Sequence, residues 1–242
     1  MTRLSIVATA TVLSLAALSA QAVTLYNNGP VVNGSGLSVL TTPATTFGFG
    51  AQTASNNAVA DDFTVAAGQT WNVESISFYG YQTGSTSFTF QNATWSVVSG
   101  DVNTGTVVAS GSTAVTSGGR VGYRVTSTTL TDTTRGIYNA VADVSDFSLG
   151  AGTYWLRWSL TGSLASGPWQ PPTSDAATGN AAQSTSGGAF ATLAEAGSGL
   201  SVSLPFTLSG TVTAVPEPSS VAMMLAGVAA LAGVARRRRP VR

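Results

Sequence analysis

The pattern that decides the fold of this chain is TYWLRWSLT at residues 153–161. Its side chains alternate, with one parity holding Tyr154, Leu156, Trp158 and Leu160 and the other holding Trp155, Arg157 and Ser159. Successive side chains of a β-strand point to opposite faces, so this period of two predicts a strand with one buried apolar face.

A second alternating stretch, at residues 200–208, leads to the same conclusion. Pro205 lies on its polar parity, and because proline has no backbone N–H to donate, it predicts an edge strand or a bulge. Residues 71–81 switch phase, which predicts a β-bulge near Glu74 and Ser75. The apolar parity of the second stretch holds Leu200, Val202, Leu204, Phe206 and Leu208.

The rest of the central region, residues 23–214, also favours strands. Further short strands are expected at residues 37–40, 59–65, 88–90, 95–98, 106–110, 121–130 and 137–144. About ten short strands with turn residues between them predict an all-β fold, a two-sheet antiparallel sandwich that is jelly-roll-like. An eight-stranded barrel is the alternative. Residues 165–199 hold three prolines and show little alternation, so we expect a surface excursion there.

Three residue types that carry much of enzyme chemistry are missing from the sequence: cysteine, histidine and lysine. Without cysteine there is no disulfide, so the fold depends on its core. Without histidine or lysine, a Ser-His-Asp triad, a Cys-His pair, the usual zinc sites, a Schiff base and a Ser-Lys dyad are excluded. Carboxylate, tyrosine and arginine chemistry and oxygen-ligated metals remain.

The charge of the central region argues against two classes of partner. Residues 23–214 hold four arginines and nine carboxylates, a formal charge of −5, although the whole chain is neutral. A weakly acidic surface without lysine argues against nucleic acid and anionic lipid as partners.

The N-terminus has the three parts of a secretory signal peptide. Arg3 gives a positive start, residues 4–18 are apolar, and Ala20-Gln21-Ala22 fits the small-x-small cleavage pattern. We therefore predict a signal peptide at residues 1–22 and a mature protein that begins at Val23. The export translocon and signal peptidase are the partners this implies.

The C-terminus combines three features in order. Pro216-Glu217-Pro218 is followed by an uncharged apolar run at residues 221–235, and then by Arg236, Arg237, Arg238 and Arg239. The apolar run predicts a transmembrane helix, which the prolines separate from the preceding domain. Because arginine clusters resist translocation, we expect them in the cytoplasm and residues 23–214 outside. An ordinary single-span anchor is the alternative.

This tail, residues 215–242, resembles the sorting signal of the PEP-CTERM family of exported bacterial proteins. The resemblance implies that a membrane-embedded exosortase recognises the Pro-Glu-Pro motif and processes the tail. It also implies transient inner-membrane anchoring, followed by release or attachment at the cell surface. Family members share the tail and not the body. Residues 60–63 and 71–81 look like the opening of β-sandwich modules in exported bacterial proteins, which implies a fold and no activity.

Asp61 and Asp62 form the first candidate site in the central region. They come just before Phe63 in an expected strand. At a strand entrance, two carboxylates and nearby backbone carbonyls can build an oxygen-rich calcium site. A solvated strand end is the alternative.

Four aromatic residues form the second candidate site. Prolines frame Trp169, and a rigid exposed aromatic ring stacks on sugar rings at small entropic cost. We therefore expect a glycan-binding surface, with Trp169 covering an edge of the core as the alternative. The four residues are Trp155, Trp169, Tyr79 and Tyr81.

Together these patterns predict a non-enzymatic exported protein of the bacterial envelope or extracellular matrix. They indicate no catalytic residue and no cofactor other than the calcium that Asp61 and Asp62 could bind. A carbohydrate-binding module for exopolysaccharide is the alternative. A carboxylate-only glycan hydrolase or lyase comes third, because it needs two carboxylates across a groove and the sequence fixes no such pair.

Overall fold

The computed structural model of the chain describes residues 22–40, 45–174 and 179–214. The predicted signal peptide (apart from Ala22) and the predicted tail at residues 215–242 lie outside these ranges. Within them, no helix is long and apolar enough to cross a membrane. The expected transmembrane run, residues 221–235, lies outside the described ranges.

The all-β prediction is confirmed, because the described residues form strands and a single 3₁₀ turn, η1 (Thr53–Ser55). The strands are β1 (Val23–Asn27), β2 (Leu37–Ser38), β3 (Phe49–Gly50), β4 (Ala58–Val65), β5 (Gln69–Gly80), β6 (Phe90–Ser99), β7 (Thr106–Arg124), β8 (Gly136–Leu149), β9 (Gly152–Gly162), β10 (Trp169–Gln170), β11 (Ala182–Ser184), β12 (Ala191–Thr192) and β13 (Phe206–Ala214).

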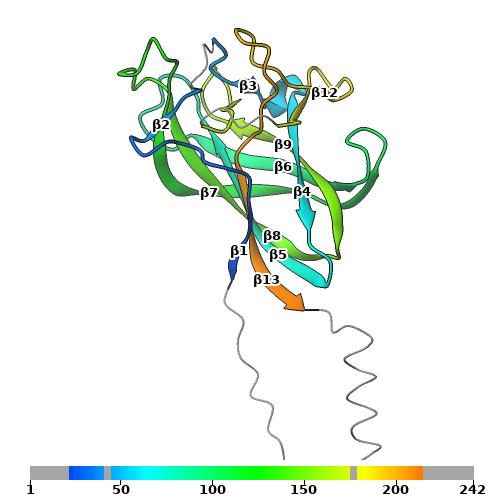
Figure 1. Cartoon of the computed structure of the whole chain (residues 1–242). Coiled ribbons are helices and arrows are strands. Elements are labelled where there is room, and N and C mark those ends of the chain that lie inside the picture. The colour runs from blue at the N-terminus through cyan, green and yellow to red at the C-terminus, as the bar shows by residue number, and fades with distance from the viewer. Residues whose placement is uncertain (1–21, 41–44, 175–178, 215–242) are drawn as a thin grey trace, which may run out of the picture.

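One large curled sheet makes up most of the molecule (Figure 1). Its order is β1-β13-β5-β8-β7-β6-β9-β4-β11-β12, with β2 added in parallel to β7, while β3 and β10 form a small second sheet. The sequence predicts two facing sheets, with separate strands at residues 106–110 and 121–130. Instead, β7 is one strand of 19 residues that pairs with β6 along its first half and with β8 along its second. It therefore joins the two halves into one sheet.

The apolar face predicted for residues 153–161 lies in the core between these halves. Leu156, Trp158 and Leu160 are at most 1% exposed. The Trp158 ring lies 5.8 Å from the rings of both Phe78 in β5 and Phe206 in β13, which belong to the other half of the sheet. Contacts of this kind pack the two halves of the curled sheet against each other across the core.

The predicted β-bulge in β5 is confirmed. In the pairing of β5 with β13, the adjacent residues Ser209 and Gly210 are opposite Ser75 and Val73, so Glu74 is the extra residue. Because of this shift, Trp71 and Val73 before the bulge and Ile76 and Phe78 after it all reach the core.

The stretch at residues 200–208 follows its predicted parity, but its strand is shorter than expected. Val202, Leu204, Phe206 and Leu208 are buried, whereas Leu200 is 37% exposed. Regular pairing with β5 begins at Phe206, the residue after Pro205. The missing N–H of the proline explains this start.

The expectation that residues 165–199 form a surface excursion is wrong. This segment contributes β10, β11 and β12, and it buries several polar side chains. Gln170, for example, is fully buried and accepts a hydrogen bond of 3.1 Å from Trp158 Nε1. Satisfied polar groups of this kind allow a segment of low hydropathy to enter the interior.

The first and last strands of the domain lie side by side. β1 pairs antiparallel with β13, and Val23 is opposite Gly210. Val23 and Ala214 therefore lie at one end of the domain, while β3 and β12 lie toward the opposite end (Figure 1).

Candidate functional site

Trp169 is held in place by backbone pairing on both sides of its strand. It pairs with Gly50 in β3, and it exchanges two backbone hydrogen bonds, of 2.9 and 3.0 Å, with Tyr81. The preceding Pro168 accepts a bond of 3.1 Å from the Ala51 N–H. This short ladder fixes the position from which the indole projects.

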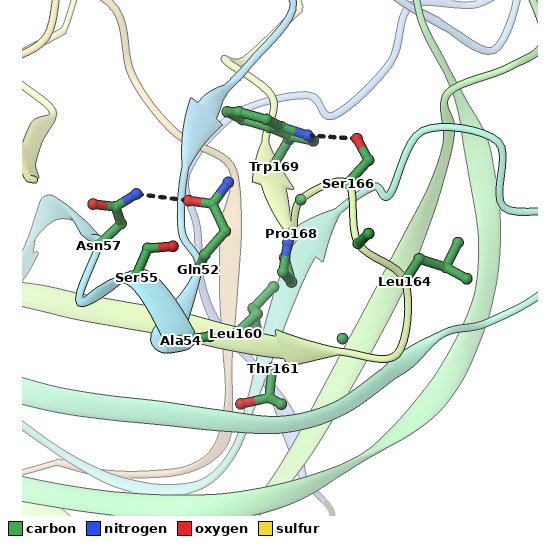
Figure 2. Close-up of a pocket in the computed structure, with 13 residues that line it drawn as sticks. Gln52, Ala54, Ser55, Asn57, Leu160, Thr161, Leu164, Ser166, Pro168 and Trp169 are labelled. Atoms are coloured by element: carbon green, nitrogen blue, oxygen red, sulfur yellow. Dashed lines mark hydrogen bonds between the residues drawn. The ribbon is translucent and has the colours of Figure 1, made fainter. Parts of the chain in front are cut away.

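The half-buried indole of Trp169 borders a cavity of about 480 Å³ (Figure 2). Trp169 Nε1 donates a hydrogen bond of 3.3 Å to Ser166 Oγ, and Asn57 Nδ2 donates one of 2.8 Å to Gln52 Oε1. All the residues that line the cavity are uncharged: Gln52, Ala54, Ser55, Asn57 and those at 160–162 and 164–169.

A second hollow, of about 350 Å³, shares Ser166 and Trp169 with this cavity. Tyr81 and Arg135 also line this second hollow. The Arg135 guanidinium lies 3.7 Å from the centre of the Phe47 ring and forms an ion pair with Asp132. Burial raises the pKa of Tyr81, so its hydroxyl stays neutral at physiological pH.

The arrangement around Trp169 suits an uncharged, hydroxyl-rich ligand. An aromatic ring offers a stacking surface, while amide and hydroxyl groups can donate and accept hydrogen bonds. Pockets with a mostly apolar wall and a few polar groups are the usual form of small-ligand sites. The cavity therefore offers an aromatic surface beside uncharged hydrogen-bonding groups.

The structure brings together only two of the four predicted aromatic residues, Trp169 and Tyr81. Trp155 projects from the outer face of β9, opposite Asp62 in β4. Tyr79 lies in β5, where its hydroxyl is 3.1 Å from Thr207 Oγ1 in β13. Tyr81 is only 2% exposed, so the expectation of an exposed stacking ring at this position is wrong. The residue instead lines the second hollow.

Sequence reasoning missed the amide pair Gln52 and Asn57. The two residues flank η1 and lie more than a hundred positions before Trp169. Their only local signal is a cluster of small polar residues that is typical of turns. Nothing in that cluster indicates that it faces Trp169.

Asp61 and Asp62 lie inside β4 rather than at its entrance. Asp61 is 1% exposed, and its carboxylate accepts hydrogen bonds from Asn28 Nδ2 at 2.6 Å and from the N–H groups of Leu204 and Asp62 at 2.7 and 2.9 Å. Burial raises the pKa of Asp61 to about 6, although these hydrogen bonds act to lower it.

This geometry does not favour the calcium site predicted at the two aspartates. N–H donors occupy the oxygens of Asp61, and adjacent strand residues point to opposite faces. Across the described ranges, no group of three or more acidic, histidine or cysteine residues is placed to hold a metal ion. Calcium binding stays a prediction from the sequence alone.

Comparison with known proteins adds the decisive observation at the C-terminus. Residues 214–239 match the family model described as the PEP-CTERM protein-sorting motif. The chain carries a PEP-CTERM sorting motif. Searches among curated proteins and among solved structures found no match.

The PEP-CTERM match agrees with the predicted tail. It contains Pro216, Glu217 and Pro218, the apolar run at residues 221–235 and the four arginines at residues 236–239. The match begins at Ala214, the last residue of β13. The PEP-CTERM motif therefore follows the β domain with no intervening linker.

Proposed function

We propose that this protein is exported, processed by an exosortase-type membrane enzyme, and displayed at the bacterial cell surface or in the extracellular matrix as a non-enzymatic component. The observation that carries the proposal is the PEP-CTERM motif at residues 214–239, directly after the last strand of the domain. The predicted signal peptide at residues 1–22 supports the same route.

The proposed route has three steps. The translocon exports the chain, and signal peptidase cleaves after Ala22. The apolar run at residues 221–235 then holds the protein in the inner membrane, with Arg236–Arg239 on the cytoplasmic side. Finally, the exosortase-type enzyme recognises Pro216-Glu217-Pro218 and removes the anchor.

The position of the domain termini supports this route. Val23 and Ala214 lie at one end of the β domain, and β3, the partner of Trp169, lies toward the other (Figure 1). A domain anchored through residues 214–239 would thus point the loops around Trp169 away from the membrane. Those loops would be the first part to meet extracellular material.

Fractionation of the host can test the sorting step. Pro216→Ala with Glu217→Gln should leave the protein in the inner membrane with its tail uncleaved, as seen by mass and by membrane extraction. Pro240→Ala, the same kind of change just outside the matched residues, is the control. Normal processing of the double variant would overturn the proposal.

A second candidate function is binding of an uncharged polysaccharide at the Trp169 cavity. It is favoured by the uncharged polar lining beside the half-buried indole. A pull-down of the purified protein on the host's extracellular polysaccharide, with calcium and with chelator, tests it. Trp169→Ala should abolish retention, and Trp155→Ala should not. Equal retention of the two variants would count against this function.

A further inference from the structure

A groove that is distinct from the two hollows beside Trp169 lies on the outer face of one half of the sheet. This half is formed by β7, β6, β9 and β4. The volume of the groove is about 510 Å³, and Arg157 and Phe190 are among its lining residues. Arg157 belongs to the outward parity of β9, the face opposite the core. This groove is thus a surface feature of the regular sheet.

The strand register surrounds Arg157 with hydroxyl groups. Ser96 in β6 is opposite both Arg157 in β9 and Ser110 in β7. In the neighbouring row, Thr94 is opposite Ser159 and Ser112. All five hydroxyl residues line the groove. Because β-strands hold these rows rigidly, the groove presents a fixed array of hydrogen-bonding groups.

The guanidinium of Arg157 is not engaged in an ion pair with any described residue, although the charge of Asp101 acts on it. Its Nε is buried without a hydrogen-bond partner, and Arg157 forms no ion pair within the described ranges. The Asp101 carboxylate, whose charge acts on Arg157, instead accepts hydrogen bonds of 2.9 Å from the N–H groups of Asn103 and Thr104. A partly desolvated charge of this kind favours an ionic ligand.

The other three arginines of the domain are arranged differently. Arg124 is fully buried and donates to backbone carbonyls. Arg135 is paired with Asp132. Arg120 is exposed and lies 5.0 Å from the centre of the Tyr123 ring, in the half of β7 that pairs with β8. Arg157 alone combines partial burial, a groove and an unpaired nitrogen.

The Phe190 ring is fixed beside this cation. Its backbone N–H donates to Asn103 Oδ1 at 2.7 Å, and its carbonyl accepts from Asn103 Nδ2 at 3.0 Å. The ring centre then lies 5.5 Å from the Arg157 guanidinium carbon. An anchored aromatic ring at the rim of a polar groove can contact the apolar face of a sugar.

We infer that this groove binds an acidic polysaccharide, with Arg157 pairing with the carboxylate of a uronic acid. The hydroxyl rows would bond to the sugar hydroxyls, and Phe190 would pack against the ring. The inference rests on the proposed function, because delivery to the cell exterior is what would bring the domain to such a polymer.

Binding of oligogalacturonate to the full-length chain in detergent tests the inference, with a neutral maltooligosaccharide of equal length for comparison. Wild type should bind the acidic ligand and not the neutral one. Arg157→Gln should weaken binding about tenfold or more, since a charge-assisted pair is lost. Arg157→Lys should recover part of it, and Phe190→Ala should weaken it. Arg120→Gln, an equal change of charge elsewhere on the surface, should leave it intact.

Three results would overturn the inference. They are absence of oligogalacturonate binding by wild type, equal binding by Arg157→Gln when its circular dichroism is unchanged, and equal losses in the Arg157→Gln and Arg120→Gln variants. Binding is measured on purified protein and sorting is measured in cells. Failure of one is therefore distinguishable from failure of the other.

Discussion

Asn28 donates a hydrogen bond of 2.6 Å from its side-chain amide to the buried carboxylate of Asp61. The same amide donates to the Leu204 carbonyl at 2.9 Å, while the Leu204 N–H donates to Asp61 at 2.7 Å. The three residues come from the segment after β1, from β4 and from the segment before β13. This one carboxylate therefore ties both ends of the domain to β4.

The raised pKa of Asp61 predicts a stability that falls with rising pH. Its pKa is about 6 when folded, above the ordinary value of 3.8, so the folded state binds the proton more tightly. The resulting stability is full below the unfolded pKa and is lost as pH rises through about 6. The free energy of unfolding should fall by about 2 kcal/mol from about pH 4.5 to about pH 7.5 because of this group.

Urea unfolding of the wild type and of Asp61→Asn across this range measures the effect. Asparagine at position 61 cannot ionise, so the free energy of unfolding of the variant should change much less over this pH range. Asp143→Asn, which removes an exposed carboxylate from β8, is the control and should keep it. An unchanged pH profile in Asp61→Asn would contradict the assignment.

Arg124 gives a second prediction, because its side chain donates hydrogen bonds to the backbone of Thr46 and Phe47, which line the second hollow. Burial lowers its pKa to about 10, and it donates to the carbonyls of Phe47, Ser38 and Thr46 at 2.8, 3.0 and 2.6 Å. Lysine keeps the charge but lacks the planar fork. Arg124→Lys should therefore cost about 2–4 kcal/mol, since buried carbonyls lose their donors.

Chemical denaturation checks this value. Arg120→Lys, in the same strand but exposed, should change stability by less than about 0.5 kcal/mol. If Arg124→Lys left the free energy of unfolding unchanged, water would have to replace the lost donors, and the prediction would be wrong.

Gly210 gives a third prediction. It lies opposite the bulge in β5, where a Cβ atom would meet the Asn72 carbonyl oxygen at 1.9 Å and the Glu74 nitrogen at 3.1 Å. Because both contacts are backbone atoms, Gly210→Ala must displace β5 or β13 and should cost about 3 kcal/mol.

The matched control for this glycine is Gly150→Ala. A Cβ at Gly150 meets no atom within 4 Å, so the thermal midpoint should stay close to that of wild type. Equal midpoints for Gly210→Ala and wild type would show that the bulge absorbs a methyl group.

The sequence predicts the parts of this fold in which one strand face is buried. The alternation at residues 153–161 and the phase change at Glu74 are examples, since each side chain there has a defined inward or outward place. β7 is harder to predict because most of its residues from Thr106 to Arg120 are exposed, and its inward positions Ala109, Gly111 and Thr113 are too small or polar to show an apolar period.

The candidate site shows a similar division. The proline frame of Trp169 marks it as a special residue, but Gln52 and Asn57 reach it only through the pairing of β10 with β3. The sequence predicts Asp61 at a strand entrance, whereas the structure buries it within β4. Its donors, Asn28 and Leu204, come from the two ends of the domain, and no local pattern reveals them.

Glu195 gives the fourth prediction and has the opposite pH dependence to Asp61. Although burial raises its pKa, hydrogen bonds from the N–H groups of Thr46, Ser198 and Thr45, at 2.8, 2.6 and 2.6 Å, lower it to about 2. A folded pKa below the ordinary value of 4.5 gives stability that is present above about pH 4.5 and is lost as pH falls through about 2.

Glu195→Gln should destabilise the protein by about 2 kcal/mol at neutral pH. Both carboxylate oxygens of Glu195 accept hydrogen bonds, and the N–H₂ group of glutamine cannot accept any. The difference from wild type should shrink on acidification toward about pH 2, where the wild-type glutamate also becomes protonated. Chemical unfolding of wild type and variant at neutral pH and at about pH 2 measures this difference in stability. A difference that stays constant would mean that Glu195 acts through packing rather than through its charge. Because Asp61 and Glu195 have opposite pH slopes, their combined contribution to stability is greatest at about pH 4.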